Sequence, residues 1–454
     1  LQATCFANVE NPPVMLHQSV WIRKFLVLSI RAFAVFGLAV FGFALATILI
    51  PTASISQSSS NEETYRQLTL FGDVFQRVRE DYVEEMSEED LISNAIKGML
   101  TSLDPHSNYL PSEAFDKMKV RTKGEFGGLG IEITMEDGLV KVVSPIDETP
   151  ADIAGIEAGD LIIQIGEEEV LGLTLAEAVE LMRGPVGTDL DITILREGNE
   201  PFTVTITRDT IKMRAVRFES YDNVGYIRLT TFSEQTTPGL IKAIDDLKDE
   251  HGDKLSGIIL DLRNNPGGLL SEAISVADTF LDKGEIVSTR GRHEDETSRY
   301  YASSGDEVDG MPIVVLINSG SASASEIVAG ALKDHHRALV MGTRSFGKGS
   351  VQSIIPLPGH GAMRLTTARY FTPSGVSIQA TGIEPDIMVE LAVVEDIENG
   401  AVREEDLRGA LDNAEDGEDS DSDDDSASIN IEDYQLARAI DLLQGLSVFN
   451  RIVE

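Results

Sequence analysis

Apolar residues recur along this chain at several different spacings, and each spacing predicts a different kind of element. Over residues 62–118 they recur every three or four positions, which predicts helices, and the proline in the stretch 103–107 is expected to end the helical pattern there. Residues 131–134 alternate between apolar and polar, as in a strand with one buried face. The runs 257–262, 313–317 and 338–341 are almost continuously apolar, which is typical of strands covered on both faces.

A loop and a helix follow the first two of these buried strands. Residues 263–268 lead into a helix predicted over 270–281, and residues 318–326 lead into one predicted over 327–333. Strands that alternate with helices predict an α/β core. In such cores the loops at the strand ends are where active sites form, so the chemistry is expected there.

The N-terminal region carries an export signal. Residues 32–50 hold no charged side chain, and as a helix they would span roughly 28 Å, close to the thickness of a bilayer's hydrocarbon core. Arg23, Lys24 and Arg31 precede this run, and positive charge stays on the cytoplasmic side. Residues 15–54 are therefore predicted to be a cleaved signal peptide or a membrane anchor, with the rest of the chain exported to the periplasm.

Charge adds a second distinctive segment. The chain has 454 residues and a net charge of −39, with 37 basic and 76 acidic side chains, which argues against a nucleic-acid partner. Residues 395–433 hold 17 acidic and 2 basic side chains, and an acidic linker is predicted over 395–430. After it, residues 431–454 carry apolar residues on one helical face and are expected to dock on another element or a second subunit.

The one cysteine, Cys5, excludes internal disulfides and cysteine-based zinc sites.

A glycine-dense loop over residues 124–131 leads into the strand predicted at 131–134. No phosphate-binding lysine follows it, whereas its free backbone N–H groups would suit a carboxylate. This loop and the pattern over 150–165 resemble a PDZ domain covering residues 118–208. The resemblance implies that a peptide adds as a strand beside the loop, with its C-terminal carboxylate on the loop amides. The residues it assigns to peptide binding are Gly128, Leu129, Gly130 and Ile131.

The loop after the second buried strand is rich in serine. A serine at a strand-to-helix turn presents its hydroxyl beside free helix N–H groups, which suits a nucleophile, but serine is also a favoured helix cap. The residues alone do not choose between Ser321, Ser323 and Ser325. A base is also required, and Lys348 stands between two glycines after Phe346, whose apolar ring suggests a pocket shielded from water.

Several motifs in order resemble the carboxy-terminal processing, or tail-specific, serine proteases. They are Leu103–Ser107, the PDZ segment, Asp261–Gly268, Asn318–Ala331, Thr343–Gln352, Ala368–Gln379 and Gly382–Ile387. The resemblance implies a Ser–Lys dyad with Ser323 as nucleophile and Lys348 as base, and Gln352 as the residue that orients the lysine. It also implies an oxyanion hole formed by the amide of Ala324 with that of Gly267 or Gly268.

The resemblance also implies an architecture. A helical region (62–117) precedes the PDZ domain, and an α/β, crotonase-like or ClpP-like protease core (209–394) follows it. The implied activity is cleavage of exported proteins near flexible C-terminal tails, with no cofactor or metal. Arg183 is a candidate sensor of bound peptide, and a homodimer and an adaptor protein are possible partners. The competing hypothesis is a membrane-tethered PDZ scaffold on an inactive protease-like fold.

Overall fold

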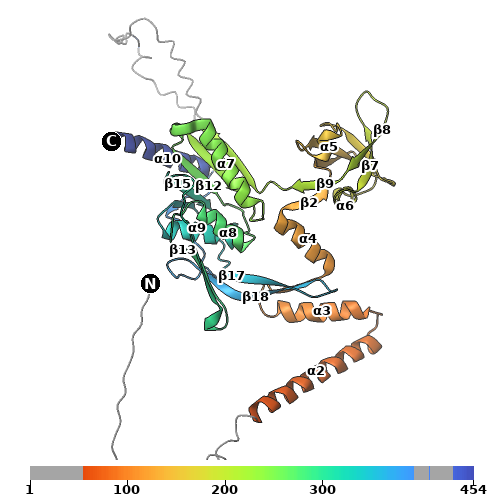
Figure 1. The fold of residues 1–454 in the computed structure, drawn as a ribbon. Helices are drawn as coiled ribbons and strands as arrows, with labels where there is room; N and C mark the ends of the chain where they lie inside the picture. Colours follow the sequence, from red (N-terminus) through yellow and green to blue (C-terminus); the bar gives the residue numbers. More distant parts are fainter. Residues whose placement is uncertain (1–54, 393–407, 409–432, 454) are drawn as a thin grey trace, which may run out of the picture. The chain divides into compact units, whose positions relative to one another are not determined.

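The computed structural model describes residues 55–392, 408 and 433–453 (Figure 1). The chain divides into two units, residues 1–94 and 95–454. The predicted export segment 15–54 lies outside the described residues, and so does the acidic linker apart from residue 408. None of the helices in the described ranges is both long and apolar enough to cross a membrane.

Helices dominate the N-terminal part of the described chain, as expected. They are α2 (Ile55–Asp81), α3 (Glu88–Thr101) and α4 (Ser112–Lys123). Three acidic residues begin α3, where they complement the positive end of the helix dipole. The helical pattern is interrupted at Asp104–Ser107, where the Asp104 carboxylate accepts hydrogen bonds from two following backbone amides and ties the chain into a turn. The break at 103–107 was expected from the proline there, whereas the short strand β1 that residues 108–110 then form was not predicted.

The segment expected to be a PDZ domain forms its own sheet around its own apolar core. The strand order is β3-β4-β5-β7-β8, and β6 pairs with β5. Strand β3 continues the predicted alternation and lies at one edge of the sheet, while Thr174 and Glu177 cap helix α6 reciprocally. Strand β2 at the start of this segment and strand β9 at its end pair with each other as a separate two-stranded ribbon. The bounds are β2 (Glu125–Gly128), β3 (Ile131–Glu136), β4 (Leu139–Pro145), α5 (Pro150–Ile153), β5 (Leu161–Ile165), β6 (Glu168–Glu169), α6 (Leu175–Met182), β7 (Asp189–Leu195), β8 (Phe202–Thr207) and β9 (Asp209–Lys212).

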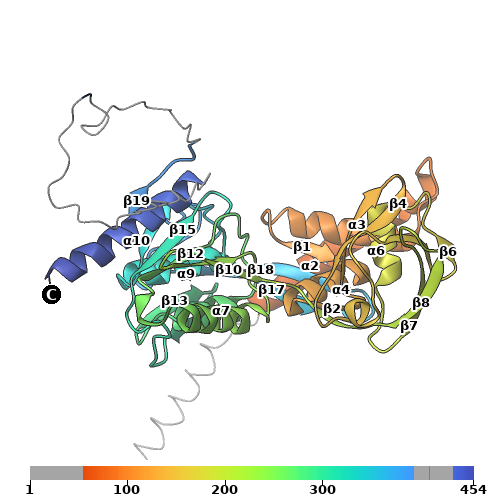
Figure 2. The same ribbon diagram turned by 90° about the horizontal axis from the view of Figure 1, so that it is seen from above.

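The α/β core is built on a sheet of order β10-β11-β12-β15-β16-β19, parallel from β11 to β19. The buried strands predicted from continuous apolar runs are confirmed as β12, β15 and β16. Alternate side chains of these strands point to opposite faces, and helices α7, α8 and α9 cover one face while α10 covers the other. Figure 2 shows α7 and α9 on one side of the strands and α10 on the other. The bounds are β10 (Val216–Tyr221), β11 (Val224–Leu229), α7 (Thr236–His251), β12 (Gly257–Asp261), α8 (Leu270–Asp278), β15 (Ile313–Ile317), α9 (Ala324–Asp334), β16 (Leu339–Gly342), β19 (Ile387–Met388) and α10 (Tyr434–Val453).

A second, antiparallel sheet lies against the same core. Its order is β1-β18-β13-β14, and β17 also pairs with β18. Strand β1 therefore joins the turn at Asp104–Ser107 to the strand pair that follows Lys348. The bounds are β1 (Asn108–Leu110), β13 (Glu285–Arg290), β14 (Thr297–Tyr301), β17 (Ser350–Pro356) and β18 (Ala362–Phe371).

Candidate active site

Ser323 stands at the turn between strand β15 and helix α9, in a strained backbone conformation. Its φ is 56° and its ψ is −108°, a region that side-chain-bearing residues rarely occupy. Such strain persists only where the surroundings enforce it, and a sharp strand-to-helix turn of this kind presents a nucleophilic serine. The side chain is 8% exposed, so its hydroxyl lies in a nearly enclosed site.

The two neighbouring serines have structural roles. Ser321 Oγ donates to the carbonyl of Leu262 at 2.8 Å, and Ser325 Oγ donates to the carbonyl of Asn265 at 2.9 Å. Both side chains are fully buried. They fasten the serine loop to the loop after β12, and the geometry therefore favours Ser323 over Ser321 and Ser325 as the reactive serine.

The glycines predicted for the oxyanion hole lie against the serine turn. A Cβ added to Gly267 would come within 3.0 Å of the backbone nitrogen of Ala324 and of the Ser323 side chain. The Gly267 N–H already donates to Asn265 Oδ1 at 2.9 Å. Within the described chain, the amides of Gly268 and Ala324 have no hydrogen-bond acceptor. These two N–H groups are the pair available to an oxyanion in this arrangement.

Glu326, which the sequence did not single out, connects the serine loop to the lysine loop. One oxygen accepts from the backbone amides of Ser323 (2.7 Å) and Lys348 (2.9 Å). The other accepts from Ser345 Oγ and from the Gly347 amide, both at 2.6 Å. Ser345 Oγ itself accepts from the amide of Ile383, so its proton points to Glu326. The carboxylate is fully buried and faces four donors, which fixes the backbone of both candidate dyad residues.

Lys348 is partly buried beside this carboxylate. Burial lowers the pKa of its ammonium group, the positive charge of Arg364 lowers it further, and Glu326 opposes both. The apolar shield expected from Phe346 is wrong, because that ring is 63% exposed. Lys348 is nevertheless desolvated, and it interacts through its charge with Arg364 of β18 and with His106 of the turn at Asp104–Ser107.

Ser323 and Lys348 lie on neighbouring loops and Gln352 lies in strand β17, but the structure does not connect the three through their side chains. Among the described residues, no hydrogen bond joins Ser323 Oγ to Lys348 Nζ. The Gln352 amide group donates to Ser350 Oγ at 3.0 Å and to Thr366 Oγ1 at 3.2 Å. The orienting role of Gln352 toward Lys348 stays a prediction.

The turn at Asp104–Ser107 supports the strand behind the lysine. Ser107 Oγ donates to the Asp104 carboxylate at 2.7 Å and accepts from the Thr366 amide at 3.1 Å. The carbonyl of His106 accepts from Arg364 Nε at 3.0 Å. His106 thus contributes to this contact through its main-chain carbonyl. Its neighbour Arg364 was not recognised in the sequence because no local motif marks a cation that acts across strands.

A groove of about 190 Å³ lies beside the PDZ loop, and it is lined by residues from β2, β3 and α6. The four residues predicted to bind peptide, Gly128, Leu129, Gly130 and Ile131, all line it. Within the described chain, the amides of Leu129 and Gly130 have no acceptor. Arg183 closes one side, with its guanidinium 4.5 Å from the Phe126 ring, and its buried Nε has no acceptor in the described residues. Free amides beside an edge strand suit a peptide carboxylate.

In the described ranges, no three or more His, Cys, Asp or Glu side chains are grouped so that they could hold a metal ion.

Family models, a solved structure and curated relatives are similar to this chain. The model of Peptidase family S41 matches residues 223–389, a PDZ domain model matches 141–196, and the model of the activating protease CtpB N-terminal domain matches 43–114. Among solved structures, the photosystem II D1 C-terminal processing protease is 32% identical, with a TM-score of 0.42, over 68% of this chain and 84% of that one.

Full-length relatives extend the likeness over most of the chain. The carboxy-terminal processing protease CtpA of Bacillus subtilis is 36% identical over 319 residues, covering 70% of this chain and 68% of the relative. A carboxy-terminal-processing protease of Bartonella bacilliformis is 54% identical over 370 residues, covering 81% of this chain and 85% of the relative. The chain therefore belongs to the family of carboxy-terminal processing proteases, serine-type peptidases that carry a PDZ domain before an α/β protease core.

Proposed function

We propose that the protein is a serine endopeptidase in which Lys348 activates Ser323, and that it cuts exported polypeptides near their C-termini. The observation that carries this proposal is the Glu326 carboxylate. It holds the backbone of a strained serine and that of a desolvated lysine at the same point. A purely structural serine cap does not need a positive φ or a buried lysine beside it.

The proposed reaction begins with a neutral Lys348 side chain. Its amine takes the proton of Ser323 Oγ as the oxygen attacks a peptide carbonyl, and the amides of Ala324 and Gly268 stabilise the resulting oxyanion. The lysine then passes that proton to the leaving amine, and water releases the acyl group from Ser323. Because Ser323 Oγ and Lys348 Nζ are not hydrogen-bonded here, the lysine side chain must turn toward the serine before this first step.

Substrate choice rests on the PDZ groove. Its free amides would hold a terminal carboxylate, and the exposed edge of β3 would pair with an extended tail. Unstructured tails fit best because a strand can be added only from a free chain. Export is inferred from the uncharged run 32–50 and the basic residues before it. We further propose that the protein forms a homodimer and works with an adaptor protein.

Arg183 is expected to link tail binding to cleavage. Arg183→Ala should lower kcat/KM about tenfold for a peptide with a free apolar C-terminus. Nη1 of Arg183 lies 3.8 Å from Glu180, but its buried Nε has no hydrogen-bond acceptor in the described residues and is free to pair with the bound tail. The same peptide with a C-terminal amide should be cleaved equally by both proteins. Equal cleavage of the free-tailed peptide would refute the sensor role.

The proposed nucleophile can be tested by labelling the full chain with a fluorophosphonate and mapping the modified peptide. We expect the label on Ser323 and none on Ser321 or Ser325, whose hydroxyls are held by backbone carbonyls. The variant Ser325→Ala, which removes one of these fixed hydroxyls, should still be labelled. A folded wild-type chain that takes no label would favour the alternative of an inactive PDZ scaffold.

A further inference from the structure

The C-terminal helix α10 packs on the sheet face opposite to helices α7, α8 and α9. Leu436, Ala439, Ile440 and Leu443 of α10 are buried against side chains of β11, β12 and β15. A Cβ added to Gly257 in β12 would come within 2.8 Å of the Leu443 side chain, which shows how closely the helix sits on that strand. This contact is apolar and by itself explains only the docking of the helix.

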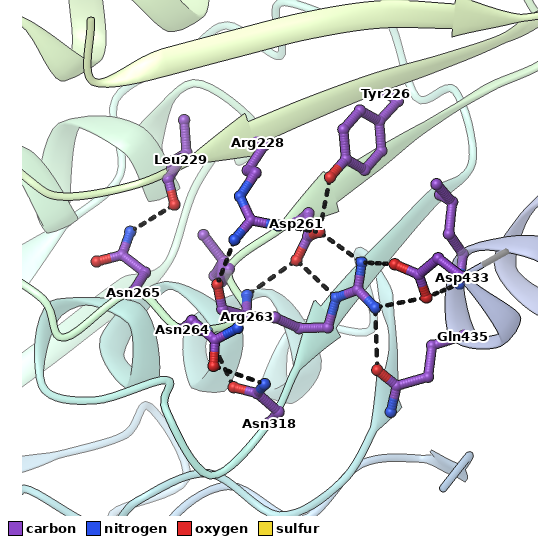
Figure 3. Close-up of polar contacts among 12 residues, drawn as sticks. Tyr226, Arg228, Leu229, Asp261, Arg263, Asn264, Asn265, Asn318, Asp433 and Gln435 are labelled. Carbon is purple, nitrogen blue, oxygen red and sulfur yellow. Dashed lines mark hydrogen bonds and ion pairs between the residues drawn. The ribbon is translucent and has the colours of Figure 1, made fainter. Parts of the chain in front are cut away.

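Charged groups make a second contact at the start of α10 (Figure 3). Arg263, 6% exposed, donates from Nη1 and Nη2 to both carboxylate oxygens of Asp433, at 2.9 and 2.7 Å. A second partner of the Arg263 guanidinium is Asp261, which accepts from Nε and Nη2 at 3.0 and 2.7 Å. Gln435 accepts from Nη1 at 3.0 Å and donates to the carbonyl of Val389. The Arg263 guanidinium is thus held by Asp261, which precedes the acidic linker in the sequence, and by Asp433 and Gln435, which follow it.

The cluster is balanced in charge. Arg228 approaches Asp261 at 3.3 Å, so two guanidinium groups face two carboxylates, and Tyr226 donates to Asp261 at 2.8 Å. Although burial alone would raise the pKa of the Asp433 carboxyl, hydrogen bonds from Arg263 hold it below its ordinary value. Without the Asp433 carboxylate, Arg263 would keep only the Asp261 carboxylate, and the two N–H groups that donate to Asp433 would lose their acceptor. The guanidinium would then be fixed less firmly.

Arg263 is also the residue from which the oxyanion loop departs. The next residue, Asn264, donates from its amide to Asn318 Oδ1 at 2.9 Å and accepts from Asn318 Nδ2 at 3.0 Å. Asn265 then donates to the carbonyl of Leu229 and accepts from the Gly267 amide. If Arg263 moved, Asn264 and Asn265, which follow it in the chain, would be displaced as well. Gly267, which donates to Asn265 and lies against Ser323, would then also move.

We propose that Asp433 and Gln435 form a latch in which the docked C-terminal helix fixes Arg263, so that Arg263 is a positioning residue for the oxyanion loop 264–268. The inference rests on the proposed function, because it assigns to that loop the stabilisation of the oxyanion. The latch makes full activity depend on the segment that follows the acidic linker. A chain whose C-terminal helix has come away from the sheet would keep Ser323 and Lys348 but hold its oxyanion donors less well.

The test compares Asp433→Asn with the wild-type full-length chain on a peptide with a free C-terminus. Asp433 is 38% exposed, so the variant should fold. We expect kcat to fall about tenfold and KM to change less than about twofold, because the loop acts in the transition state and not in tail binding. Asp433→Glu, which keeps the carboxylate, should recover most of kcat. Hydrogen exchange of the amides in residues 264–268 should be faster in Asp433→Asn.

The matched control is Asp441→Asn, which removes an exposed ion pair with Arg438 on the same helix and does not touch Arg263. It should leave both kcat and the loop exchange unchanged. If Asp433→Asn kept the wild-type kcat and the wild-type hydrogen exchange of residues 264–268, the latch would be overturned. A rise in hydrogen exchange spread evenly over the whole chain would also overturn it, because it would show a merely structural role for Asp433. The exchange measurement does not depend on catalysis. If the wild-type chain proved inactive, the proposed function would fail while the mechanical link from Asp433 to the loop would still be decided.

Discussion

Lys348→Ala is expected to reduce peptide cleavage to background, a loss of at least about a thousandfold in kcat, because a general base of this kind contributes factors of that order. Ser323→Ala should lose as much, and the double variant should be no worse than either, since the two groups act as one unit. Lys348→Arg should be nearly as damaging because a guanidinium stays protonated. The measurement is steady-state cleavage of a tailed peptide, with circular dichroism to confirm the fold.

The control for this loss is Lys242→Ala. Lys242 is an exposed lysine of helix α7 that pairs with Asp246, and its removal should leave kcat unchanged. Residual cleavage by purified Lys348→Ala protein within tenfold of wild type would contradict the role of the lysine as base.

The pH dependence of cleavage follows from the same lysine. Burial and Arg364 lower the pKa of Lys348, so its neutral form appears at lower pH than for an ordinary lysine. Cleavage is therefore expected to rise with pH through this lowered pKa and to fall away in acid as Lys348 takes up a proton.

Glu326→Ala is expected to have the second largest effect, and it should damage both activity and stability. Its loss leaves the amides of Ser323, Gly347 and Lys348 and the hydroxyl of Ser345 without their acceptor in a buried site. Unsatisfied buried donors cost about 2–4 kcal/mol in the free energy of unfolding. Because both dyad residues lose their anchor, kcat should fall about a hundredfold, since misplacing reacting groups by about 1 Å has effects of that order.

Two further variants separate these effects. Glu326→Gln keeps the shape but turns an NH₂ group toward donors, so it should remain impaired. Asp306→Asn is the matched control, because Asp306 also accepts from two amides and from Arg337 but contacts neither catalytic loop. It should lower the denaturant midpoint and leave kcat of the folded protein unchanged. Normal kcat in Glu326→Ala would show that the carboxylate is dispensable for positioning.

Sequence patterns predicted the buried strands well because their signal is local. The runs 257–262 and 313–317 are apolar on both faces, and the structure places them in the centre of the sheet. The alternation at 131–134 likewise predicted strand β3. The proline in 103–107 marked the break that follows helix α3. No pattern predicted strand β1 at 108–110, because pairing with β18 determines its conformation.

The candidate site was predictable only in part. The serine-rich loop pointed to the turn after β15, and the choice of Ser323 within it needed the family resemblance. The structure adds the backbone strain of Ser323 and the bonded hydroxyls of Ser321 and Ser325. Glu326 was not singled out in the sequence, because its partners Ser345, Gly347 and Lys348 come from a distant loop. The environment of Lys348 was misjudged at Phe346 for the same reason. Long-range contacts leave no local pattern.

The most direct test of a Ser323–Lys348 dyad is the rate of fluorophosphonate labelling at Ser323 as a function of pH, in the wild-type chain and in Lys348→Arg. The label reacts with the activated serine and bypasses the need for a known substrate. We expect a wild-type rate that rises with pH through a pKa below that of an ordinary lysine, and a rate near background for Lys348→Arg at every pH. Equal labelling of the two proteins, or a label on any other serine, would contradict the dyad.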